Sequence, residues 1–138
     1  MSEAGSLRPW FEAYVDAFNR DDFEGFGAYY AKDVVFQGQA AQLVGREEVL
    51  AFYRFVKSKI DETLELLSFV GSRDLGRIAV EMRTLLVARE DWLDMPTGAM
   101  RAGDRRESVN FILYDIVDDR FTRVRSARFS SPGAGRPA

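Results

Sequence analysis

Three helices are predicted in the first 60 residues, because apolar side chains recur there every three or four positions. The first stretch opens with Ser6, which can cap a helix, and Pro9, which fits a first turn. A short strand starting at residues 34–36 (Val-Val-Phe) separates the second helix from the third. The predicted buried faces are Trp10, Tyr14, Ala17 and Phe18, then Phe23, Phe26 and Tyr30, and finally Val49, Phe52, Val56 and Ile60.

After Asp61 the apolar period changes from about 3.6 to 2, which is typical of strands. Four strands are predicted, at residues 63–72, 76–90, 105–117 and 121–129, with hairpin turns at residues 74–76 (DLG) and 117–120 (VDDR). Helices followed by consecutive strands predict an α+β fold, with the helices on one face of an antiparallel sheet. Leu85, Phe111 and Leu113 place apolar groups on the other face as well. We therefore expect a homodimer formed through that outer face.

The composition excludes several kinds of active site. The 138 residues contain no Cys and no His, which removes thiolate nucleophiles, His-based triads and the usual zinc and haem ligands. The groups that carry out any acid–base chemistry must be Asp, Glu, Tyr, Lys or water. The only lysines are Lys32, Lys57 and Lys59, so a Schiff base has few candidates.

The chain is predicted to be one cytoplasmic domain over residues 1–130 with a flexible tail at 131–138, where Ser, Gly and Pro gather. A net charge of −3 argues against a nucleic-acid partner. No apolar run is long enough for a membrane span, and no secretory signal is visible at the start. The excess of Arg over Lys is typical of a GC-rich bacterial genome.

Three blocks of the chain resemble the NTF2-like superfamily, in the branch that holds ketosteroid isomerases and SnoaL-type polyketide cyclases. They are residues 14–22 (YVDAFNRDD), 30–36 (YAKDVVF) and 45–53 (GREEVLAFY). Residues 95–98 (MPTG) are similar to a loop of SnoaL-like and epoxide-hydrolase-like members. The resemblance, over residues 8 to about 130, implies a cystatin-like cone of three N-terminal helices on a curved antiparallel sheet. It also implies an apolar pocket that works without a cofactor or metal.

Ketosteroid isomerases use an Asp base and two neutral donors that stabilise an enolate. The resemblance places the donors at Tyr14 and Asn110, the second of which is an acid in the family pattern. The base position falls on Gly38, which cannot accept a proton, so weak or no steroid isomerisation is predicted; Asp33 and Glu81 are the alternative carboxylates. The predicted lining of the pocket is Trp10, Phe18, Phe36, Gln37, Phe52, Val80, Met82 and Ile112.

The acidic catalytic positions of two other enzyme types in this branch are also occupied by non-acidic residues here. The acidic positions of the epoxide hydrolases fall on Thr84 and Ser126, which leaves only an Arg such as Arg83 or Arg125. Residues 123–129, where SnoaL-type cyclases are believed to carry an Asp, contain no carboxylate. Two functions stay open: an isomerase, cyclase or dehydratase of a small hydrophobic, steroid- or polyketide-like carbonyl compound, or a non-catalytic binding or scaffold protein. A carboxylate that points into the pocket within hydrogen-bond reach of Tyr14 would favour the enzyme, and the absence of one would favour the binder.

Overall fold

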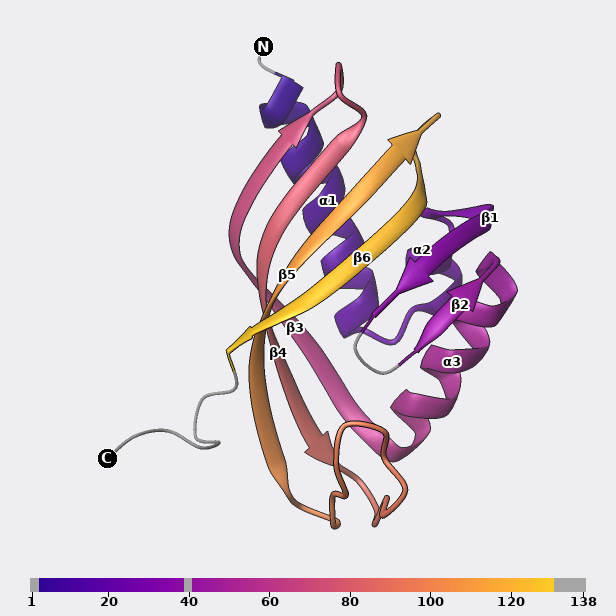
Figure 1. The fold of residues 1–138 in the computed structure, drawn as a ribbon, viewed down its shortest axis with the longest axis vertical. Helices are drawn as coiled ribbons and strands as arrows, with labels where there is room; N and C mark the ends of the chain where they lie inside the picture. The colour runs from indigo at the N-terminus through magenta and orange to yellow at the C-terminus, as the bar shows by residue number, and fades with distance from the viewer. Residues whose placement is uncertain (1–2, 39–40, 131–138) are drawn as a thin grey trace.

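The computed structural model describes residues 3–38 and 41–130, and it shows helices on one side of a long, curved sheet (Figure 1). The predicted tail and Gln39 lie outside these residues. The helices are α1 (Glu3–Asn19), α2 (Phe23–Gly27) and α3 (Arg46–Lys59). The strands are β1 (Tyr30–Gln37), β2 (Gln42–Val44), β3 (Ile60–Ser72), β4 (Arg77–Ala88), β5 (Arg105–Val117) and β6 (Arg120–Ser130). None of these helices is long and apolar enough to cross a membrane.

The six strands lie in the order β2-β1-β6-β5-β4-β3. All neighbours are antiparallel except β1 and β6, which run parallel and pair Phe36 with Val124. The prediction of an antiparallel sheet was therefore wrong for one pair. The hairpin turns fix the directions of β3 to β6, whereas β1 reaches the sheet by a long connection that allows either direction.

The long hairpins are held by turns that the sequence signals. Asp118 and Asp119 both adopt positive φ, 52° and 57°, as a two-residue turn between twisted strands requires. At the other hairpin, Gly76 has φ 60°, and a Cβ there would lie 2.8 Å from the carbonyl oxygen of Ile116. Only Gly allows this turn to pack against β5.

The helices differ from the prediction in two ways. The first helix already includes Glu3, so Pro9 lies inside it and Ser6 is not its cap. The third helix follows β1 and β2, in agreement with the strand predicted between the second and third helices, so the three N-terminal helices that the family resemblance implies do not all precede the sheet. The prediction missed β2, because three residues are too few to show a period.

A buried lysine ties three elements together beside the core. The Lys57 ammonium, 3% exposed, donates to the carbonyl oxygens of Phe18 at 2.8 Å and Glu62 at 3.1 Å. It also pairs with the Asp21 carboxylate and lies 4.0 Å from the centre of the Phe18 ring. Lys57 thus fixes the end of α1 and the start of β3 relative to α3.

Candidate functional site

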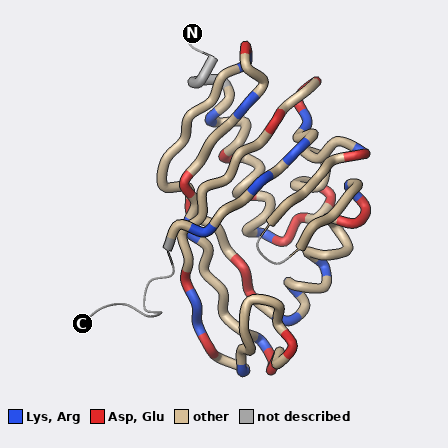
Figure 2. Tube along the Cα trace, viewed as in Figure 1, with Lys and Arg blue, Asp and Glu red and all other residues tan. Residues whose placement is uncertain are grey.

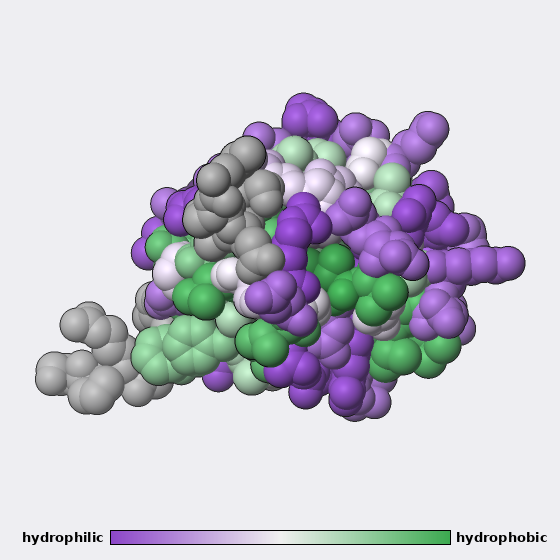
Figure 3. All heavy atoms as spheres, turned by 90° about the horizontal axis from the view of Figure 1, so that it is seen from above, coloured by the Kyte–Doolittle hydropathy of each residue, from purple (hydrophilic) through white to green (hydrophobic). Residues whose placement is uncertain are grey.

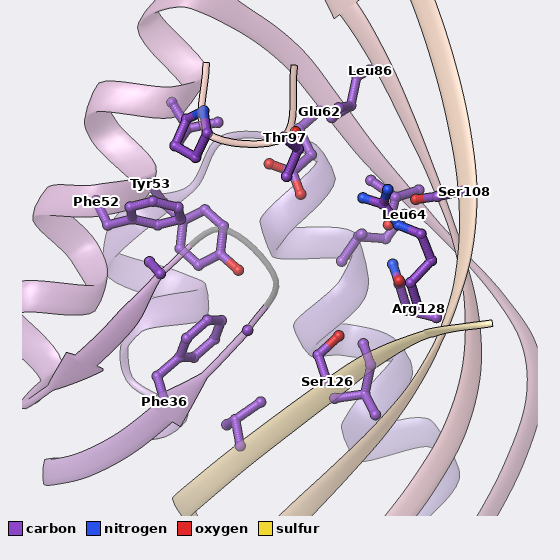
Figure 4. Close-up of a pocket in the computed structure, with 18 of the residues that line it drawn as sticks. Phe36, Phe52, Tyr53, Glu62, Leu64, Leu86, Thr97, Ser108, Ser126 and Arg128 are labelled. Carbon is purple, nitrogen blue, oxygen red and sulfur yellow. The ribbon is translucent and has the colours of Figure 1, made fainter. Parts of the chain in front are cut away.

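A cavity of about 320 Å³ lies between α3, the inner face of the sheet and the loop before β5. Figure 4 shows Phe36, Phe52 and Tyr53 on one side and residues of the long strands on the other. Most of the lining is apolar, which suits a small hydrophobic molecule. The loop contributes Trp92, Met95, Pro96 and Thr97.

The Arg106 guanidinium holds this loop over the cavity. It donates to the carbonyl oxygens of Gly98 at 3.2 Å and Ala99 at 3.1 Å, and more weakly to that of Thr97 at 3.5 Å. A bridge between Trp92 and Met100 closes the base of the loop. The loop that resembles the family pattern is therefore a fixed wall of the cavity.

The structure brings some of the predicted site residues together. Tyr14 and Asn110 both line the cavity, and so do three of the predicted apolar residues, Phe36, Phe52 and Ile112. Asn110, Ile112 and Tyr114 alternate along β5 and share the inner face, as the period of 2 predicts. The base position, Gly38, also lies in the cavity wall.

The other predicted lining residues lie elsewhere. Trp10 packs on Tyr29 and Phe121, with ring centroids 4.8 and 5.5 Å away, and Phe18 lies in the core. Only one turn of α1 reaches the cavity, so a shared helical face does not place all of its members there. Val80 and Met82 are also core residues, and Gln37 accepts a hydrogen bond from Arg123 at 3.4 Å.

Hydroxyl groups gather at one end of the cavity. The Tyr14 and Tyr30 oxygens are 2.7 Å apart, and Tyr53 and Tyr114 line the cavity beside them. Burial raises the pKa of Tyr14 well above its ordinary value, and the neighbouring Tyr30 raises it further. Burial likewise raises the pKa of Tyr53 and Tyr114. These groups are therefore neutral hydrogen-bond donors at physiological pH.

The sequence analysis missed a carboxyl group, Glu62, which projects into the cavity (Figure 4). Burial raises its pKa from 4.5 to about 7, although the positive charge of Lys57 lowers it in part. Glu62 alternates with Ile60 and Leu64 on the inner face of β3. That alternation was the available signal, but the strand was predicted to begin one residue after Glu62.

The alternative carboxylates do not line the cavity. Asp33 is exposed on β1, and Glu81 accepts a hydrogen bond from Ser68. Asp115, the acid nearest to residues 123–129 in the sequence, pairs with Arg77 at 3.0 Å and does not line the cavity. Within residues 3–38 and 41–130, no cluster of three or more acidic side chains could hold a metal ion.

The residues at the acidic positions of the epoxide hydrolases do line the cavity. Thr84 and Ser126 lie there, but neither can act as an acid or base. Arg83 does not reach the cavity, since it pairs with Glu65 at 2.6 Å, and Arg125 lies 4.0 Å from Asp115. The arginine that lines the cavity is Arg128, which the sequence analysis did not single out.

Asn110 keeps hydrogen-bonding capacity for a ligand. Its Oδ1 atom is buried and has no partner among the described residues. An unmet buried polar atom costs about 1–3 kcal/mol, so a site that leaves one is typically completed by water or ligand. The cavity thus combines a carboxyl group of raised pKa, neutral hydroxyl groups and an incompletely bonded amide.

Comparison with known proteins agrees with this architecture. A candidate polyketide cyclase of Xanthomonas campestris pv. campestris superposes with a TM-score of 0.76 at 23% identity, over 91% of each chain. A candidate ketosteroid isomerase of Kribbella flavida gives 0.68 at 21% identity, over 100% of this chain and 86% of the other. An LEH-like epoxide hydrolase of M. tuberculosis gives 0.72 at 14% identity, over 93% and 86%.

At these identities the superpositions show the fold alone. A search of curated proteins gave no match. The SnoaL-like domain family, in contrast, matches residues 11–124, which include α2, α3 and β1 to β5 in full. The chain therefore belongs to the SnoaL-like domain family.

Proposed function

We propose that this protein catalyses proton transfer on a small hydrophobic carbonyl compound, as an isomerase, cyclase or dehydratase that needs no cofactor. The observation that carries the proposal is Glu62, a carboxyl group with a pKa of about 7 in an apolar cavity. A general base works best when its pKa lies near the working pH, because it is then both available and basic enough. Burial tunes Glu62 to that range.

The proposed reaction uses three groups of the cavity. The ionised Glu62 removes a proton from the carbon beside the substrate carbonyl, and the electron pair of that C–H bond forms the enolate. The enolate oxygen accepts hydrogen bonds from the Tyr14 hydroxyl and the Asn110 amide, which stabilise its charge. Protonated Glu62 then returns the proton to another carbon or to a leaving oxygen.

The alternative, a non-catalytic binding or scaffold protein, rested on the missing base at Gly38. Glu62 supplies a carboxyl group in the cavity from a different strand, which supports the enzyme, although no hydrogen bond joins it to Tyr14 within residues 3–38 and 41–130. Epoxide hydrolysis finds less support, since Thr84 and Ser126 stand at the positions of its acids.

Exchange of α-protons tests the proposal without knowledge of the natural substrate. The probe is 2-tetralone, a bicyclic ketone, followed by NMR in D₂O at neutral pH. We expect the protein to accelerate deuterium incorporation beyond the rate in buffer alone. A rate equal to that in buffer, while calorimetry shows that the ketone binds, would support the non-catalytic alternative.

A tyrosine pair separates a donor role for Tyr14 from a structural one. Tyr14→Phe and Tyr30→Phe remove the same hydrogen bond, so each is expected to lower the free energy of unfolding by about 1–2 kcal/mol. Only Tyr14 lines the cavity, so Tyr14→Phe alone should slow exchange, by about tenfold, the value of one hydrogen bond. Equal rates in the two variants would remove Tyr14 from the proposed mechanism.

We also propose that two copies pair through the outer face of the sheet. Phe111 and Phe129 are 49% and 64% exposed there, and their rings lie 4.9 Å apart. Apolar groups are also exposed among charged ones in the view from above (Figure 3). Light scattering at micromolar concentration should give twice the mass of the 15.7 kDa chain, and a value near 15.7 kDa would contradict the pairing.

A further inference from the structure

Arg128, an exposed residue that also lines the cavity, provides a positive charge that the proposed proton transfer does not use. Basic residues recur along β6 (Figure 2). Arg123 and Arg125 do not line the cavity: Arg123 donates to Gln37, and Arg125 lies near Asp115. Arg128 alternates with Ser126 and Val124, which line the cavity. Figure 4 shows its side chain along the sheet wall, near Ser108.

No acidic side chain of residues 3–38 and 41–130 forms an ion pair with Arg128. Arg128 is also the only Lys or Arg among the described residues that line the cavity. A guanidinium has five N–H donors and no acceptor, so its natural counterpart is an acceptor. Planar oxyanions match its fork with two parallel hydrogen bonds.

The surroundings of Arg128 are the polar part of a mostly apolar cavity. Asn110 stands directly opposite Arg128 in the pairing of β5 with β6. The hydroxyl groups of Ser108 and Ser126 belong to the same part of the lining. Arg128 and the two serine hydroxyl groups can hold one small polar head, while the apolar part of the cavity takes the rest of a ligand.

Glu62 lies at a different level of the sheet. In the strand register, Arg128 is level with Met82 on β4 and Glu62 with Leu86, which is four residues further along that strand. Four residues of a strand span roughly 13 Å. A ligand whose polar head binds Arg128 would therefore place the far end of its apolar body toward Glu62.

We propose that the substrate is a carboxylic acid, held by its carboxylate at Arg128 with its apolar body in the cavity; this rests on the proposed function only for the carbonyl that reacts at Glu62. The carboxylate accepts two hydrogen bonds from the guanidinium. The hydroxyl groups of Ser108 and Ser126 complete the head-group site. Arg128 is thus a residue that determines specificity and orients the substrate.

A matched pair of ligands tests this assignment. The probes are 2-naphthoic acid and 2-naphthamide, which have nearly the same shape and differ in charge, measured by isothermal titration calorimetry at pH 6. We expect the acid to bind at least about tenfold more tightly than the amide, as a charge-assisted bidentate contact implies. Equal affinities, or no binding of the acid at millimolar concentration, overturn the proposal.

Two variants on the same strand locate the effect. Arg128→Gln should weaken the acid at least about tenfold and change the affinity of the amide less than twofold, which also shows that the cavity is intact. Arg123→Gln, which removes an arginine outside the cavity, should change neither affinity. Equal weakening of both ligands by Arg128→Gln, or loss of the acid preference in Arg123→Gln, overturns the assignment.

The same measurements separate this proposal from the proposed function. Loss of 2-tetralone exchange with the acid preference intact contradicts the catalytic role of Glu62 and leaves the carboxylate site standing. Exchange of 2-tetralone protons without any preference for the acid contradicts the carboxylate site and leaves the catalytic role of Glu62 standing.

Discussion

Glu62→Gln is expected to slow the exchange of 2-tetralone α-protons by about 10²- to 10⁴-fold, the usual contribution of a general base. The amide keeps the size of the side chain but cannot accept the proton. The matched control is Glu65→Gln, because Glu65 lies on the same strand but pairs with Arg83 on the outer face. The control should exchange at the unchanged rate. A loss of less than threefold in Glu62→Gln would contradict its role as the base.

The pH dependence gives Glu62 a second signature. Exchange by the unmodified protein should rise as pH passes through about 7, since only the ionised carboxylate accepts a proton. The folded chain keeps this proton up to about pH 7, whereas the unfolded chain loses it near 4.5. Stability therefore falls as pH rises between these values, by at most about 3 kcal/mol.

The Glu62→Gln variant should lack the part of this pH-dependent loss of stability that is due to Glu62. Denaturation with urea at pH 4.5 and pH 8 gives the change in the free energy of unfolding between these pH values for each protein. Subtracting the change in the variant from that in the unmodified protein leaves the contribution of Glu62, because the other carboxyl groups contribute equally to both. The variant should gain stability relative to the unmodified protein at pH 8. An identical pH dependence of the two proteins would show that the pKa of Glu62 is ordinary.

Lys57→Met is expected to lower the free energy of unfolding by about 3 kcal/mol, because it removes a buried ammonium that pairs with the exposed Asp21 carboxylate and donates to two carbonyl oxygens. The change leaves the carbonyl oxygens of Phe18 and Glu62 without their donor. The control is Lys59→Met, since Lys59 pairs with Glu90 at the surface, where a pair contributes about 1 kcal/mol or less. Urea denaturation measures both, and equal losses would show that burial adds nothing at Lys57.

The same variant should also move the pH profile of catalysis. The charge of Lys57 lowers the pKa of Glu62, so its removal should shift the midpoint of the exchange profile above that of the unmodified protein. Lys59→Met should leave the midpoint in place. An unmoved midpoint in Lys57→Met would separate the structural role of this lysine from the titration of Glu62.

Much of the fold was predictable because each element carries a local signal. The change of apolar period after Asp61 predicts the long strands, and the turn at Asp118 and Asp119 predicts their last hairpin. The parallel neighbour of β6 was not predictable, because pairing between distant strands leaves no period in either one. The start of α1 was placed too late because Ser6 and Pro9 imitate a helix start.

The site residues were predictable only where the family pattern or the alternation along a strand predicts a side chain that faces the inside of the fold. Tyr14 and Asn110 were found in that way, and both line the cavity. Trp10, Phe18 and Met82 share inward faces with them but fill the core. Periodicity predicts which face of an element is buried, but it does not predict which residues of that face line a cavity. Glu62 was missed because a carboxyl group at the start of a strand is typical of a solvent-exposed position, and its raised pKa results from burial that the sequence does not show.

The parallel pairing of β1 with β6 has a consequence for the order of folding. Tyr30 pairs with Phe121, and the amide of Phe121 donates to the carbonyl oxygen of Tyr29 at 2.7 Å. This contact closes a loop of roughly 90 residues, which is slow compared with forming a hairpin. During synthesis, β1 leaves the ribosome well before the strand that it pairs with exists. The aromatic faces that pack on Phe121, those of Trp10, Phe11, Tyr14 and Tyr30, therefore stay uncovered in the nascent chain until its last strand arrives, and chaperones have most to protect at that stage.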